Sequence, residues 1–152
     1  EVALLDIETA GTRNFTITFE APDDAGDALK SISNNTDLWL NWTSIVTDGA
    51  GTDPSRAIKV KMNATISGLD VKVQPGALSA DGEGTKGTIV GSALTLSTTD
   101  QDLVTAIGSC YTGNGSSKGS NLTYSFAPTS GSYGDLKKTA TTLTITYTLT
   151  DN

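Results

Sequence analysis

Residues 141–152, TTLTITYTLTDN, decide the fold, because apolar and threonine side chains alternate along them. Leu143, Ile145, Tyr147 and Leu149 share one face, and threonines occupy the other. Period-two alternation is typical of a β-strand with one buried and one solvated face. Threonine, with its branched β-carbon, suits the solvated face. The segment therefore predicts a strand that covers a hydrophobic core.

The same alternation recurs along the chain, separated by turn-rich stretches. Strands are expected at residues 14–20, 38–46, 57–66, 69–74, 88–96, 102–107 and 121–126. One helical turn is expected near residues 25–32. The pattern predicts an all-β fold, a two-sheet antiparallel β-sandwich of immunoglobulin-like, pilin-like or jelly-roll-like type with roughly 8–10 strands.

Composition agrees with one β domain and limits the function classes. The 152 residues include 25 Thr, 15 Ser and 16 Gly, and the net charge is −7. An acidic chain is a poor ligand for nucleic-acid phosphate, and no apolar run reaches the ~20 residues of a membrane span. A start at Glu rather than Met indicates a removed signal peptide, so we expect export to the cell surface or beyond.

The sequence offers little support for a catalytic or metal-binding site. The chain has no His, which removes His-activated nucleophiles and imidazole ligands, and its single Cys110 cannot form an internal disulfide. Carboxylates for glycoside hydrolysis or calcium binding lie in turns without a recognisable spacing: Asp23, Asp24, Asp27, Asp48, Asp53, Asp81 and Glu83. The segment GEGTKG at residues 82–87 precedes a predicted strand rather than a helix, so we interpret it as a hairpin loop. We expect a non-enzyme without cofactor or metal.

The N-terminal segment EVALLDIE is apolar on both faces. Ala3, Leu5 and Ile7 lie on one side, and Val2 and Leu4 lie on the other. Such a strand favours burial on both sides. It is either the first strand of its own domain or a strand donated to the sheet of a neighbour, which propagates head-to-tail. In the second case residues 1–8 are the donor strand, 9–12 the hinge and 13–152 the β-sandwich domain.

Two surface features complete the candidate sites. Six of eight asparagines begin an N-x-S/T sequon, which predicts either glycosylation or ordinary polar-face patterning: Asn14, Asn34, Asn41, Asn63, Asn114 and Asn121. Trp39 alternates with inward-facing Leu38 and Leu40, so its ring is expected to stack on a sugar, contact a partner or lie under a loop.

The apolar N-terminal strand, the Thr/Ser/Gly-rich β domain without His, and the terminal TLTITYTLTDN resemble exported fibre subunits of the pilin type. The phrases LWLNWTSIV, IGSCYTGNG, NLTYSF and TLTITYTLTD are similar to small exported proteins of Bacteroidota. This resemblance implies a structural or adhesive homopolymer joined by donor strands. The alternative is a secreted carbohydrate-binding or adhesin module that contacts surface polysaccharide through Trp39, Tyr111 or Tyr133.

Overall fold

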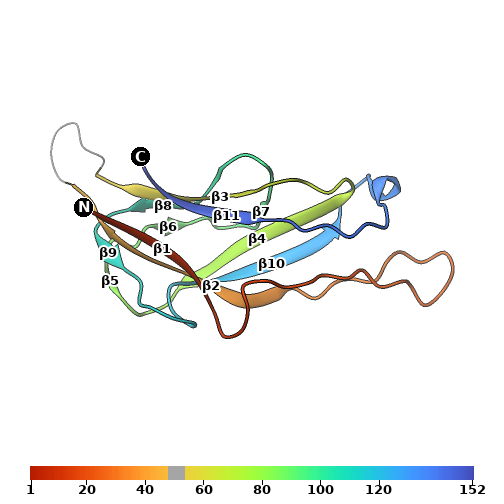
Figure 1. The fold of residues 1–152 in the computed structure, drawn as a ribbon, viewed down its shortest axis with the longest axis horizontal. Coiled ribbons are helices and arrows are strands. Elements are labelled where there is room, and N and C mark those ends of the chain that lie inside the picture. The colour runs from red at the N-terminus through yellow and green to blue at the C-terminus, as the bar shows by residue number, and fades with distance from the viewer. Residues whose placement is uncertain (48–53) are drawn as a thin grey trace.

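The computed structural model describes residues 1–47 and 54–152, and it contains two antiparallel β-sheets that pack face to face (Figure 1). This confirms the predicted two-sheet antiparallel β-sandwich. Within the described residues the one helical element is a 3-10 turn, η1 (Tyr133–Asp135).

The larger sheet is built around β2, its longest strand. Its strands follow the order β5 (Glu83–Gly84), β9 (Cys110–Tyr111), β2 (Asn35–Ile45), β10 (Ser120–Pro128), β4 (Leu69–Leu78) and β7 (Leu94–Thr95). β1 (Val2–Thr9) pairs with β2 over Leu38–Ile45, where β10 and β9 also pair with β2. Since a strand has two edges, β1 lies on the edge of β2 opposite to β10 and β9.

The smaller sheet has four strands in the order β11 (Ile145–Asp151), β3 (Arg56–Met62), β8 (Gln101–Ile107) and β6 (Thr88–Ile89). Its edge strand β11 pairs with β3 from Ile145↔Met62 to Asp151↔Arg56. Figure 1 shows β1 and β11 running along the same side of the sandwich, one from each sheet. The edges of the two layers therefore meet there.

The core lies between the sheets and follows the predicted alternation. Its buried members include Leu38, Leu40, Trp42, Ile58, Val60, Met62, Val71, Val73, Leu122 and Tyr124. The inward residues of β11 and the preceding Leu143 pack against this core while remaining half-buried. Burial of alternate side chains from both sheets is the main stabilising term of such a sandwich.

The prediction of a strand at residues 14–20 is wrong, although the side chains of this segment do alternate between half-buried and exposed. Phe15, Ile17 and Phe19 are half-buried between exposed neighbours, yet no strand is formed. The Phe15 ring packs against Tyr124 and Phe126, with ring centroids 5.5 and 6.1 Å away. This segment therefore has apolar anchors but no ladder partner.

Three other boundaries are corrected. Residues 25–32 form no helix, because Gly26 has a φ of 104°, which a right-handed helix does not adopt. Residues 88–96 contain two short strands rather than one, since β6 pairs with β8 in one sheet and β7 pairs with β4 in the other. The strand expected at 57–66 ends at Met62, and Ala64 is exposed.

Candidate strand-exchange site

The predicted donor strand lies in the sheet of its own chain. β1 pairs with β2 along its whole length, from Val2↔Ile45 to Thr9↔Leu38. In the described part of the chain its outer edge pairs with no other strand. β1 is therefore an edge strand that one neighbour holds by main-chain hydrogen bonds.

Only one face of β1 contacts the core. Leu5 and Ile7 are half-buried and pack against it. Val2 is 39% exposed and Leu4 is 63% exposed, and Ala3 is exposed as well. The two-sided burial that the sequence favours is not reached within this chain, and Leu4 is not an anchor in its own sheet.

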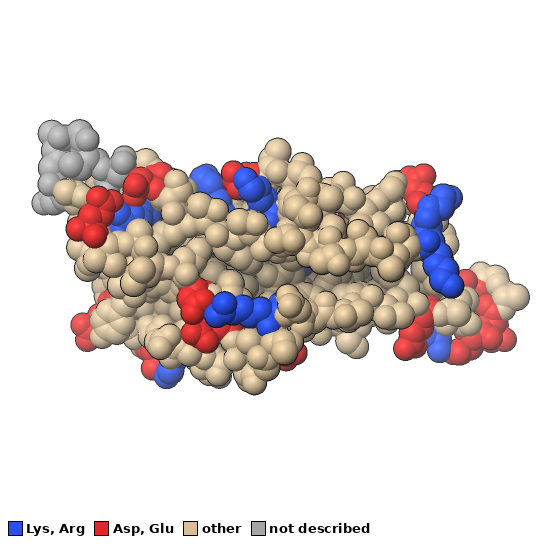
Figure 2. Space-filling model, viewed as in Figure 1, with Lys and Arg blue, Asp and Glu red and all other residues tan. Residues whose placement is uncertain are grey.

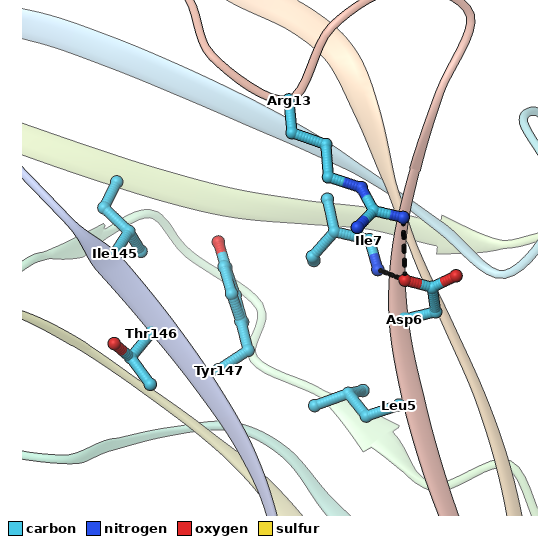
Figure 3. Close-up of a pocket in the computed structure, with 7 residues that line it drawn as sticks. All are labelled: Leu5, Asp6, Ile7, Arg13, Ile145, Thr146 and Tyr147. Atoms are coloured by element: carbon cyan, nitrogen blue, oxygen red, sulfur yellow. Dashed lines mark hydrogen bonds and ion pairs between the residues drawn. The ribbon is translucent and has the colours of Figure 1, made fainter.

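A hollow of about 320 Å³ separates the two edge strands. Figure 3 shows Leu5 and Ile7 of β1 facing Ile145 and Tyr147 of β11 across it, with Arg13 above. The space-filling view shows a shallow channel between the layers and a surface that is largely uncharged, with small groups of opposite charges (Figure 2). The side of the sandwich between β1 and β11 is therefore apolar below and polar at its rim.

Asp6 and Arg13 cap the outer edge of β1. Asp6 Oδ1 accepts hydrogen bonds from the backbone N–H of Ile7 at 2.8 Å and from Arg13 Nη2 at 3.0 Å. Because an unpaired backbone N–H is a template for further strand pairing, this cap limits unwanted association at the edge. Both side chains are exposed, so the ion pair itself adds little to stability.

Arg56, at the start of β3, is the buried charge of this region. Its guanidinium group donates to Asp151 Oδ1 at 2.7 Å, to the Val2 carbonyl at 2.6 Å, and to a Glu1 carboxylate oxygen. It also donates to Ser44 Oγ and to the Ile45 carbonyl, both at 3.1 Å. One side chain therefore joins the start of β1, the end of β2 and the end of β11.

Sequence reasoning did not identify Arg56, although a signal was present. Arg56 is two residues before Ile58, so extending the alternation of β3 by one step places it on the inward face. A cation on that face requires partners. The partners come from segments far apart in the sequence, which the alternation cannot reveal.

Tyr124 of β10 and Tyr147 of β11 join the two sheets through a hydrogen bond between their hydroxyl groups. Burial raises the pKa of Tyr124 to about 12 and raises the pKa of Tyr147 well above its ordinary value. Both phenols are therefore neutral near pH 7, and the pair is a structural contact between the sheets.

The connection after β1 has few contacts at its start. In the predicted hinge at 9–12, the Gly11 N–H donates to Thr9 Oγ1 at 3.0 Å, and a side-chain carbon placed on Gly11 would meet no atom within 4 Å. Residues 10–34 contain no strand, and Figure 1 shows them extending beyond the sheets. The Phe15 ring anchors this connection to β10, so a short stretch of chain between Thr9 and Phe15 links β1 to the nearest fixed point of the domain.

The six sequon asparagines divide by exposure. Asn14, Asn34, Asn63 and Asn114 are exposed, and Asn121 is half-buried while its side-chain amide donates to the Thr36 and Leu38 carbonyls. The exposure expected of Asn41 is wrong. Asn41 is 4% exposed, and its Nδ2 donates to the Gly115 carbonyl at 2.9 Å. The loop after β9 covers this part of β2, which excludes a glycan at Asn41.

The three aromatic residues named as sugar-stacking candidates lie apart from one another. Trp39 is half-buried rather than exposed, whereas Tyr111 and Tyr133 are about half exposed. Tyr111 lies on β9 and Tyr133 on η1, at opposite ends of the molecule in Figure 1. The three rings do not form one sugar-binding face.

Two of the candidate acids form ion pairs. Asp23 pairs with Lys30 and Asp81 with Lys118, each at 2.7 Å; the hydrogen bond from Lys118 lowers the pKa of Asp81. Cys110 is buried, and burial raises the pKa of its thiol. Asp48 and Asp53 lie outside the described residues. Elsewhere in the chain, no three His, Cys, Asp or Glu side chains gather as a metal site. A short strand, β6, follows the glycine-rich segment 82–87.

Comparison of the chain with protein-family models, curated proteins and solved structures gave no match in any of the three. Among the described residues, no helix has the length and apolar character to span a membrane.

Proposed function

We propose that this chain is a structural subunit of an extracellular filament, and that copies join head-to-tail by exchange of the N-terminal strand β1. The observation that supports this most directly is the position of β1. It is an edge strand with exposed apolar side chains, and its connection to the domain, residues 10–34, forms no ladder.

Strand exchange retains the contacts that β1 makes in the isolated chain. A neighbour's β1 in the same slot forms the same ladder with β2 and places Leu5 and Ile7 against the same core. Identical contacts make such an exchange inexpensive in free energy. Because each copy gives its strand to the next copy, the contact is heterologous and continues into an open chain.

The strength of the joint depends on how fully the groove buries the apolar side chains of the donated strand. Fully burying one Leu or Ile side chain stabilises by about 1.5–3 kcal/mol, and the main-chain ladder adds directional bonds. In the filament the parent domains also come close together, which offers cover to Val2 and Leu4. The filament then covers both apolar faces of β1, whereas the isolated chain covers only one.

A reversible lock on β1 tests this function. Val2 and Ile45 are directly paired across the two strands and both are partly exposed, so Val2→Cys with Ile45→Cys, in a Cys110→Ser background, suits a disulfide. Oxidation of the dilute monomer fixes β1 in its own sheet. We expect no filaments in negative-stain images, and filaments after the disulfide is reduced.

The matched control is Val2→Cys alone in the same Cys110→Ser background, treated with the same oxidant and reductant. It should assemble under both conditions. Filaments that form equally well from the oxidised double variant would show that β1 stays in its own sheet during assembly, and they would contradict the proposal.

A further inference from the structure

The end of the sandwich where β1 begins contains a buried guanidinium group whose partners come partly from β1 itself. Arg56 is 2% exposed. Of the five hydrogen bonds that its side chain donates within residues 1–47 and 54–152, two go to Glu1 and Val2, and three go to Ser44, Ile45 and Asp151. The first two leave with β1, whereas the other three remain in the domain.

We infer that Arg56 is a recognition site for an acidic side chain at the first position of a strand donated by another copy of this chain, and that it sets the register of that strand. The inference rests on the proposed strand exchange. It identifies the accepted ligand as an extended segment with an acid followed, four and six residues later, by apolar side chains.

The spacing within β1 supports a role in register. Glu1, Leu5 and Ile7 are odd-numbered, so they point to the same face of the strand. Arg56 receives Glu1 at one end of the strand, and the groove receives Leu5 and Ile7 further along. A slip by one residue turns all three side chains to the other face. A slip by two moves Glu1 by about 7 Å, out of contact with Arg56.

Charge gives the site its selectivity. Leaving a buried cation without its partners costs free energy. When β1 leaves the edge of β2, Arg56 therefore favours a replacement strand that carries a carboxylate. The chain's other apolar alternating segments near this side lack that acid. Four residues before Ile145 the chain has Thr141, and four residues before Phe15 it has Gly11. Arg56 therefore distinguishes β1 from these segments.

A peptide competition on the full-length chain tests the site. Three N-acetylated peptides of residues 1–12 carry different mass tags: the natural sequence, Glu1→Gln and Glu8→Gln. Glu8→Gln makes the same change in charge, but Glu8 lies on the opposite face of the strand. The Glu8→Gln peptide is therefore the matched control. Equal amounts are added together during assembly, and native mass spectrometry measures the ratio of the three chain–peptide complexes.

We expect the Glu1→Gln peptide to be captured about tenfold less than the natural one, as a hydrogen bond to a charged group implies, and the Glu8→Gln peptide within about twofold. Equal capture of all three would overturn the recognition site while strand exchange stands. Capture of none, with chains that assemble normally, would overturn both proposals. The chain's own β1 competes equally with all three peptides, so it does not affect the ratio of the three complexes.

Discussion

β1 and β11 are both edge strands on the same side of the sandwich, yet their outward faces differ. β11 presents threonines away from the core, including Thr146 and Thr148, whereas β1 presents Val2 and Leu4, which are 39% and 63% exposed. Polar side chains on an edge strand limit its pairing with other molecules. The outward face of β1 therefore carries two exposed apolar side chains beside the exposed Asp6, whereas the outward face of β11 carries threonines.

The two strands are nevertheless connected at one end. Arg56 donates to Glu1 at the start of β1 and to Asp151 at the end of β11. Further along, the groove separates them.

Replacement of Arg56 by Met should have the largest effect, because it removes five hydrogen bonds to three strands. We expect a loss of about 3 kcal/mol in the free energy of unfolding, measured by urea denaturation. Arg13→Met is the matched control, since it removes the exposed pair with Asp6 and should cost less than about 1 kcal/mol. Similar losses in both variants would show that Arg56 does not hold the strands.

Alkaline pH should weaken the contact that holds β11 to the other sheet. The pKa of Tyr124 is raised to about 12 in the fold, against about 10 when unfolded. A raised pKa stabilises the fold fully below pH 10, and this contribution is lost as the pH rises toward 12. Two pKa units correspond to about 3 kcal/mol.

Urea midpoints measured from pH 8 to 12 should therefore fall above pH 10. The Tyr124→Phe/Tyr147→Phe double variant should lose most of this decline, because neither buried phenol remains. A double variant that declines as steeply as the natural chain would assign the alkaline sensitivity to other groups.

The hydroxyl pair itself is testable at neutral pH. Tyr147→Phe leaves the Tyr124 hydroxyl buried without its hydrogen-bond partner, and we expect a cost of about 1–3 kcal/mol. Removing both hydroxyl groups should cost less than the two single changes added together. A double-mutant cycle on unfolding free energies measures this coupling, and additive losses would mean that the hydrogen bond contributes nothing.

The smallest effect is expected on the outward face of β1. Leu4→Thr should change the unfolding free energy of the monomer by at most about 0.5 kcal/mol, because its side chain is mostly exposed. Leu5→Thr, one residue further, should cost about 1–2 kcal/mol, because Leu5 packs against the core. A large loss for Leu4→Thr would show that its side chain already has a role in the isolated chain.

The sequence predicts local features of this molecule well. Alternation identifies the inward faces of β2, β4, β10 and β11, and the all-β sandwich follows from their number and the turns between them. It fails where a residue's surroundings come from distant segments. Asn41 alternates as an outward residue, yet the loop that contains Gly115 covers it. Residues 14–20 alternate as a strand, yet their apolar side chains pack on the core without a ladder partner, as the contacts of Phe15 with Tyr124 and Phe126 show.

The candidate site is predicted in part for the same reason. The apolar character of Val2–Ile7 is visible in the sequence, but which of its faces meets the core depends on its register with β2. The alternation of β3 extends to Arg56, but its partners Glu1 and Asp151 lie at the two ends of the sequence. Only the closing of the two sheets brings these charges together.

Disulfide trapping after assembly shows whether β1 of one copy lies beside β2 of the next, which the proposed filament requires. Filaments of the Val2→Cys/Ile45→Cys/Cys110→Ser chain, assembled from equal amounts of ¹⁴N- and ¹⁵N-labelled protein under reducing conditions, are then oxidised. Denaturing gels without reductant separate the products, and mass spectrometry reads the isotope content of the linked peptides. We expect a ladder of covalent oligomers in which peptides of mixed isotope content are linked. Oxidation to monomers alone, with every linked peptide from one isotope, would contradict it.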